Sequence, residues 1–266
     1  MVVFRLSLFV VLLVSNVFAC YPHENLMVCW DMQEGKDARV KDSSGKGQDG
    51  SMNGAVGWAP GTSPRAVTQF ATYSGSATFA NTGPTMITFP GTADVDVRNV
   101  DTSKFAFTGV TPMIIVITIQ PTVLEAVDNR ELVACDASGV GGWQFWHDNT
   151  GLFGIRVITV AAPTFTYRLA DTNPHRAMLA RNSLGHTYLF IDGEFKEVMS
   201  VASSVLAVTA ALKVGGDDGG LGIFTGKANR LAIYNFDFLD AYIKAFAKNE
   251  YRYWQGMNEP MDQEEK

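Results

Sequence analysis

The stretch Met113-Ile114-Ile115-Val116-Ile117-Thr118-Ile119-Gln120, enclosed by Pro112 and Pro121, is the strongest strand signal in the chain. Most of its side chains are β-branched, and β-branched residues favour extended backbone. Because apolar residues occupy both alternating sets of positions, both faces of the strand need cover. We therefore expect a central strand of a sheet that is buried on both sides.

Further short apolar runs lie on either side of this stretch and are separated by turn-forming residues. Asp192-Gly193 is a tight-turn dipeptide and predicts a hairpin between two of these runs. One segment, residues 239–254, has the 3.6-residue periodicity of a helix, with Asp240 as its expected N-cap. The pattern predicts an all-β, two-sheet antiparallel jelly-roll sandwich with one short C-terminal helix. The expected strands are Leu26–Trp30, Glu131–Cys135, Gly142–His147, Gly151–Val160, Ala177–Arg181, Thr187–Ile191, Phe195–Met199, Leu212–Gly215 and Arg230–Tyr234.

Composition places the chain among globular proteins. Of its 266 residues, 47% are hydrophobic and 18% are charged, which is enough apolar surface for a folded core. The formal net charge is −6, so the chain lacks the basic footprint of a nucleic-acid-binding protein. Residues 20–256 read as a single β-sandwich domain, and residues 257–266 read as an acidic, flexible tail.

The first 19 residues have the pattern of a secretory signal peptide. Arg5 precedes an apolar run, and Val17-Phe18-Ala19 offers a cleavage site after Ala19. The alternative is an uncleaved N-terminal anchor, because the segment is just long enough to cross a bilayer. We expect an exported protein, secreted or at the cell surface, with a membrane as partner only if residues 1–19 are retained.

Three cysteines follow this segment: Cys20, Cys29 and Cys135. An oxidising compartment would allow one disulfide among three pairings. Cys29–Cys135 would leave Cys20 unpaired, whereas Cys20–Cys29 would tie down the N-terminus. The spacing of the cysteines does not choose between these pairings. The candidate disulfide joins Cys29 to Cys135.

Three ordered stretches resemble the LamG-like jelly-roll group of the concanavalin A-like lectin/glucanase superfamily. The first joins Leu26–Asp31 to the loop Val40–Gly50, the second joins His175-Arg176-Ala177 to Leu189–Gly193, and the third runs from Val214 to Asn235. The resemblance spans residues 26–246 and implies a sandwich that recognises glycans or extracellular proteins. It also implies a structural calcium, although Arg230 stands where the family usually has an acidic ligand.

Acidic, glycine-rich loops are the candidate calcium site. Calcium takes six to eight oxygen ligands, and such loops supply them from carboxylates and carbonyls. Turns with free carboxylates explain the same residues, so both interpretations stay open. The candidate calcium ligands are Asp42, Asp49, Asp217, Asp218 and Asn229.

The segment around Trp143 is the candidate ligand site. Alternation puts Trp143 and Phe145 on one face of the strand and Gln144 and Trp146 on the other. One face should enter the core, and the other has an aromatic ring for stacking on a sugar. The alternative is that both aromatic residues fill the sandwich. The candidate ligand-binding residues are Trp143, Trp146, Asp148 and Asn149.

These observations favour a non-catalytic, exported binding module with an adhesive or accessory role. A structural subunit of a membrane-associated or larger assembly, with no sugar site, is a second hypothesis. A glycoside hydrolase of the glucanase branch is a third, but it needs two closely spaced carboxylates, and the chain has no Glu-x-Asp-x-x-Glu motif.

Overall fold

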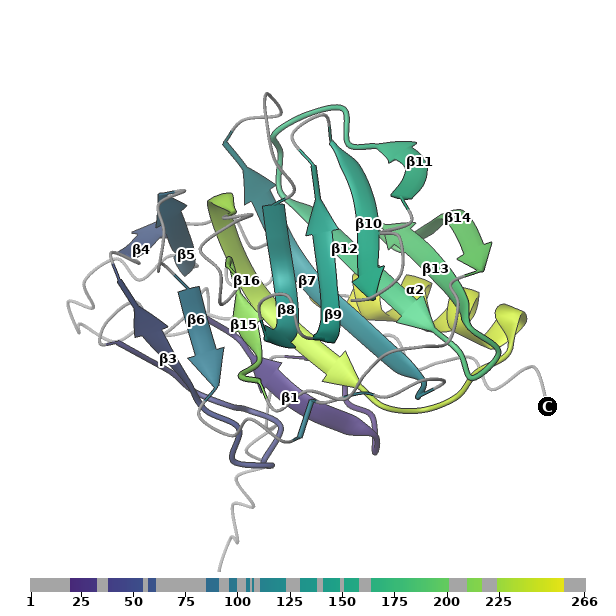
Figure 1. Ribbon diagram of the computed structural model, residues 1–266, viewed down its shortest axis with the longest axis horizontal. Helices are drawn as coiled ribbons and strands as arrows, with labels where there is room; N and C mark the ends of the chain where they lie inside the picture. Colours follow the sequence, from purple (N-terminus) through teal and green to yellow (C-terminus); the bar gives the residue numbers. More distant parts are fainter. Residues whose placement is uncertain are drawn as a thin grey trace, which may run out of the picture.

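The computed structural model describes residues 20–32, 38–54, 57–60, 85–90, 96–99, 104–105, 107, 111–122, 130–137, 141–148, 151–157, 164–200, 210–216 and 224–255 (Figure 1). Two antiparallel sheets of eight strands each face one another across an apolar core. The predicted two-sheet, all-β sandwich with one short helix is confirmed.

The sheets are called sheet A and sheet B. Sheet A has the order β14 (Glu194–Ser200), β13 (His186–Ile191), β12 (His175–Arg181), β7 (Met113–Pro121), β16 (Thr225–Tyr234), β5 (Thr85–Pro90) and β4 (Gly57–Pro60), and β1 (Leu26–Trp30) also pairs with β16. Sheet B has the order β11 (Thr164–Arg168), β10 (Leu152–Val157), β9 (Gly141–His147), β8 (Arg130–Ala137), β15 (Lys213–Val214), β6 (Asp96–Asn99), β3 (Gly50–Asn53) and β2 (Arg39–Val40).

Strand β7 is the central, doubly covered strand that its sequence predicts. It pairs with β12 on one side and β16 on the other. Ile115, Ile117 and Ile119 enter the core between the sheets, whereas Ile114 and Val116 belong to a second apolar cluster on the outer face of sheet A. That second cluster also contains residues of the helix, so the helix covers the outer face.

The predicted hairpin forms between β13 and β14. Asp192 and Gly193 both adopt positive φ, 55° and 76°, as a two-residue turn of this kind requires. The sequence-predicted strands all correspond to strands of the structure. Strands β2, β3, β4, β5, β6 and β11 were not predicted.

The helix α2 spans Asp240–Trp254 and packs on the outer face of sheet A through Ile243, Phe246 and Ala247 (Figure 1). The prediction that Asp240 is the N-cap is wrong: Leu239 occupies that position and makes no side-chain cap. Asp240 instead accepts a hydrogen bond from the Tyr188 hydroxyl, which draws its carboxylate toward the sheet. Among the described residues, no helix has the length and hydrophobicity needed to cross a membrane.

A buried ion pair fastens α2 to sheet A. Arg176 of β12 donates from Nε to both carboxylate oxygens of Glu250, at 3.2 and 3.1 Å, and from Nη1 to Thr118 Oγ1 at 3.0 Å. The Arg176 guanidinium also reaches the carbonyl of Arg230. Both partners of the pair are buried, so each charge depends on the other.

Arg230 makes a second connection to the helix. Its Nε donates to Asp31 Oδ1 at 3.2 Å, and its Nη1 donates to the carbonyl of Trp254 at 3.3 Å, in the last turn of α2. The residue that departs from the family pattern thus joins the end of β1, the strand β16 and the helix.

Candidate functional site

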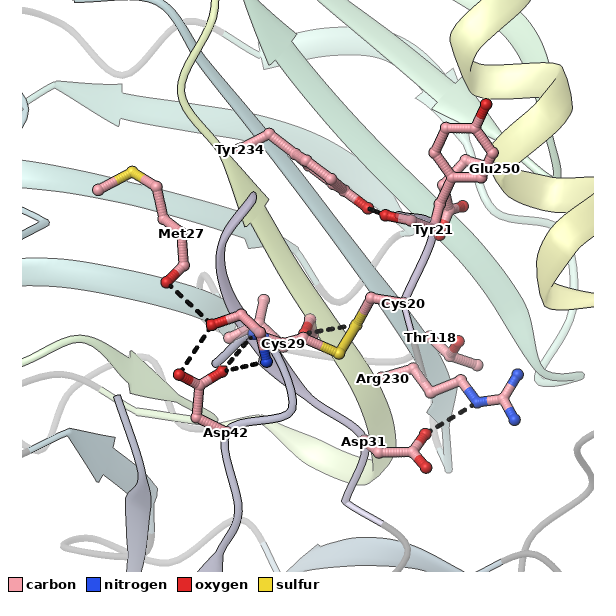
Figure 2. Close-up of a disulfide and its surroundings, with 12 residues drawn as sticks. Cys20, Tyr21, Met27, Cys29, Asp31, Asp42, Thr118, Arg230, Tyr234 and Glu250 are labelled. Carbon is pink, nitrogen blue, oxygen red and sulfur yellow. Dashed lines mark hydrogen bonds and ion pairs between the residues drawn. A yellow bond between two sulfur atoms is a disulfide. The ribbon is translucent and has the colours of Figure 1, made fainter. Parts of the chain in front are cut away.

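A disulfide between Cys20 and Cys29 closes the segment that precedes β1 (Figure 2). The candidate pair Cys29–Cys135 is therefore wrong. Cys29 lies in the apolar cluster on the outer face of sheet A, whereas Cys135 lies in the core between the sheets, so sheet A separates them. Cys135 lies outside the disulfide, and its buried thiol donates to the carbonyl of Ala210 at 3.4 Å. Residues 20–29 are called the disulfide loop below.

Aromatic contacts hold the disulfide loop against α2 and the end of β16. The Tyr21 ring meets Phe246 edge-on at 5.4 Å between centroids, and its carbonyl accepts a hydrogen bond from the Tyr234 hydroxyl at 3.0 Å (Figure 2). The His23 ring stacks on Phe236 at 4.3 Å. These contacts keep the backbone of the loop in place, which gives its exposed side chains defined positions.

His23 also organises the turn from within. Its Nδ1 accepts a hydrogen bond from the backbone N–H of Asn25 at 3.1 Å. Burial lowers the pKa of His23, although the nearby Glu24 carboxylate acts in the opposite direction. A neutral imidazole suits an Nδ1 that accepts a hydrogen bond.

Three open grooves meet at the disulfide loop, with cavity volumes of about 340, 400 and 510 Å³. Such volumes match those of ordinary ligand pockets. Glu24 is exposed and lines all three grooves. Around it, the grooves present amide, hydroxyl, amine, carboxylate and aromatic groups. These are Asn25, Gln48, Lys104 and Asn235 in the first, Ser43 and Ser44 in the second, Phe236, Asp237 and Tyr242 in the third, and Lys46 in the first two.

Asp42 fixes the position of Ser44, which lines the second groove. One carboxylate oxygen accepts from the backbone N–H groups of Cys29 at 3.0 Å and Ser44 at 2.9 Å (Figure 2). The other accepts from the Ser44 hydroxyl and the Gln48 N–H, both at 2.8 Å. Both oxygens are thus occupied by hydrogen-bond donors, as in an Asx-turn that joins the glycine-rich loop to β1.

The other candidate calcium ligands have separate environments. Asp49 lies close to Asp42, because its Oδ1 accepts from the Asp42 N–H at 2.7 Å. That hydrogen bond, and the ion pair with Arg39, lower the pKa of the Asp49 carboxyl. Asn229 is buried in β16 opposite Thr118. Asp217 and Asp218 lie outside the described residues. Within the part of the chain that is described, no three His, Cys, Asp or Glu side chains are grouped as metal ligands.

The candidate aromatic segment forms strand β9. Trp143 and Phe145 enter the core, and Trp143 Nε1 donates to the Phe105 carbonyl at 2.8 Å. Trp146 faces the opposite side of sheet B but is only 2% exposed, so its ring has little surface to offer a sugar. Its ring lies over Gly154 of β10, where an added Cβ would come within 2.3 Å of it.

The polar end of this segment forms a turn. Asp148 Oδ1 accepts from the Leu152 N–H at 2.9 Å, and the Asp148 carbonyl accepts from the Gly151 N–H at 3.1 Å. Asn149 lies outside the described residues. The sequence therefore predicted the ligand site on a strand that belongs to the core. It did not identify the disulfide loop as a candidate site. The signal that could have found the loop is Pro22-His23-Glu24-Asn25 between two cysteines.

Comparisons with solved structures match the fold of this chain at low sequence identity. Domain 4 of an extracellular arabinanase from Geobacillus stearothermophilus, in complex with arabinotriose, has a TM-score of 0.57 at 12% identity, covering 84% of this chain and 98% of that domain. The binding domain of botulinum neurotoxin serotype G has a TM-score of 0.62 at 9% identity, and the match covers 85% of this chain but 50% of the toxin domain.

The sialidase of Trypanosoma rangeli, in complex with sialic acid, has a TM-score of 0.57 at 12% identity, covering 87% of this chain and 34% of the sialidase. No protein-family model matches the chain, and no curated protein matches it either. The fold of this chain is therefore that of the β-sandwich domains found in these proteins.

Proposed function

We propose that this chain is an exported, non-catalytic module that binds a glycan at the disulfide loop. The observation that carries the proposal is the meeting of three grooves at Glu24, on a loop held by a disulfide and by aromatic packing. Carboxylate, amide and hydroxyl groups are the partners that sugar hydroxyls take in hydrogen bonds. Rigid scaffolds that present such groups on loops are typical of binding proteins.

Two further observations support the proposal. A structural disulfide fits an oxidising, extracytoplasmic environment. The arabinanase domain was solved with arabinotriose and the sialidase with sialic acid, so sandwiches of this fold occur in proteins that hold sugars. The fold alone does not choose a ligand, and the site must be tested by itself.

A glycan array probed with residues 20–266, with calcium and with a chelator, tests the proposal. We expect selective binding that survives the chelator, because donors from the protein occupy both oxygens of Asp42. Loss of binding in the chelator would show that glycan binding requires calcium. Absence of binding under both conditions would overturn the glycan proposal and leave an extracellular protein as the ligand to seek.

Variants locate the site. Glu24→Gln removes the charge at the meeting point of the grooves, so we expect binding about 10–100-fold weaker, the worth of a hydrogen bond to a charged group. Glu194→Gln is the matched control, because Glu194 is exposed on β14 and lines none of the three grooves. Equal affinities of the two variants would place the site elsewhere.

A further inference from the structure

A buried arginine lies at one end of the interior of the sandwich. Arg181 is the last residue of β12 and is 1% exposed. It faces inward, since Ala177 and Leu179, which share its face of the strand, belong to the core between the sheets. Thr187 of β13 is its cross-strand partner and is fully buried. Their side chains therefore lie next to each other on the inner face of sheet A.

Neither side chain finds a hydrogen-bond partner among the described residues. Arg181 Nε and Nη2 are buried without one, and so is Thr187 Oγ1. On the neighbouring strands, Arg181 pairs with Met113 of β7 and Thr187 pairs with Met199 of β14. Both methionines are apolar and pack against the core. Burial lowers the pKa of Arg181, with no carboxylate acting against that effect.

Two side-chain acceptors at the adjoining turn, Asn182 in the turn and Asp237 beside it, accept hydrogen bonds from the turn itself. Asn182 Oδ1 accepts from the N–H groups of Leu184 at 3.1 Å and His186 at 3.0 Å. Asp237 accepts from both the N–H and the hydroxyl of Ser183. Among the described residues, no acceptor of this turn makes a hydrogen bond with Arg181 Nε or Nη2.

A buried charge without a counter-charge is among the most costly features that a folded protein can contain. Guanidinium groups only donate hydrogen bonds, and the Thr187 hydroxyl has a proton to donate as well. Buried donors of this kind require an acceptor, and the positive charge requires a negative one. Water supplies a hydrogen-bond acceptor but not a negative charge.

We propose that a small monovalent anion, a halide or a compact carboxylate, binds between Arg181 and Thr187. The ion accepts hydrogen bonds from Arg181 Nε and Nη2 and from Thr187 Oγ1. Arg181 directly precedes the turn of residues 182–185, so the site lies at the surface end of the two strands rather than in the middle of the core. This site is separate from the disulfide loop and independent of the proposed glycan binding.

Thermal unfolding in chloride, formate or gluconate at constant ionic strength tests the site. Ligands that bind only the folded state raise its melting temperature. Chloride or formate should raise the Tm by about 3–5 °C for each tenfold increase in concentration above the dissociation constant, for a domain of this size. Gluconate is too bulky and serves as the reference. A rise with chloride alone identifies a halide, and a rise with formate alone identifies a carboxylate.

Arg181→Met removes the charge and should abolish this anion dependence while raising the Tm in gluconate. Thr187→Val should weaken the dependence, and Arg252→Met, which removes an exposed arginine of α2, should leave it unchanged. Bromide-soaked crystals of the unaltered protein give a second readout: an anomalous peak within hydrogen-bond distance of Arg181. Identical anion dependence in the unaltered protein and Arg181→Met would overturn the proposal. If chloride raises the Tm, the absence of bromide at Arg181 would overturn it as well.

Discussion

His175 shows how a single residue fixes the entry into a strand. It begins β12, where its Nδ1 meets Asp192 Oδ2 at 2.7 Å and its Nε2 meets Asp171 Oδ1 at 2.9 Å. The hydrogen bond with Asp192 is the main cause that raises the pKa of His175, and the bond with Asp171 adds to it. The protonated imidazole can donate to both carboxylates at once.

Protonation of His175 therefore stabilises the fold. Because its folded-state pKa lies above the unfolded value, this stability is fully present below the unfolded pKa and is lost as the pH rises through the folded pKa. From pH 6 to pH 8 the free energy of unfolding should therefore fall by less in His175→Asn than in the unaltered protein. Urea unfolding at both pH values measures it. The same pH dependence in both proteins would contradict a raised pKa of His175.

The helix α2 depends on one buried ion pair for its attachment. Removing one partner of such a pair leaves a buried charge and typically costs about 3–5 kcal/mol. We expect that loss for Glu250→Ala, because Arg176 would keep its charge beneath the helix. The exposed pair Glu194–Lys196 is the control, and Glu194→Ala should cost less than about 1 kcal/mol.

Denaturant unfolding of the two variants gives the comparison. The double variant Arg176→Met with Glu250→Leu provides a second test, since replacing both charges with apolar groups is often neutral. Recovery of stability in the double variant would show that the pair orients the helix rather than supplying net stability. Similar losses for Glu194→Ala and Glu250→Ala would contradict the buried pair.

For the whole molecule, the disulfide connects the N-terminal segment to the sandwich. Closing a loop of this length should stabilise the fold by roughly 2–3 kcal/mol, chiefly through the unfolded state. We expect Cys20→Ser with Cys29→Ser to lose that amount and to weaken ligand binding at the grooves, because the loop that carries Glu24 is then held by packing alone.

Thiol titration under denaturing conditions checks the pairing first. The chain has three cysteines, so one thiol should react before reduction and three after it. A peptide map that joins Cys29 to Cys135 would contradict the pairing, and no loss of stability in the double variant would contradict its energetic role.

Much of the architecture was predictable because local patterns determine it. Three signals are local, because each depends only on residues close together in the sequence: the apolar run of β7, the Asp192-Gly193 turn and the periodicity of α2. Several unpredicted strands are short pieces in sheet B, such as β2 and β3, where few positions carry a pattern.

The candidate site depends on contacts that no local pattern records. The first groove joins Glu24, Lys46, Lys104 and Asn235, which the fold brings together from distant parts of the chain. Trp143 and Trp146 suited either a ligand or the core, because an aromatic side chain in a strand serves either purpose. Only the positions of the two sheets decide between those roles.

The position of β16 has a consequence for how the protein is made. This strand, residues 225–234, lies between β7 and β5 in sheet A and also pairs with β1, so the first and last strands of the chain meet in it. A nascent chain that has not yet released these residues from the ribosome has a sheet A without the strand that joins β7 to β5 and β1. Sheet A therefore cannot close before β16 has been synthesised, although all of its other strands precede β16 in the chain.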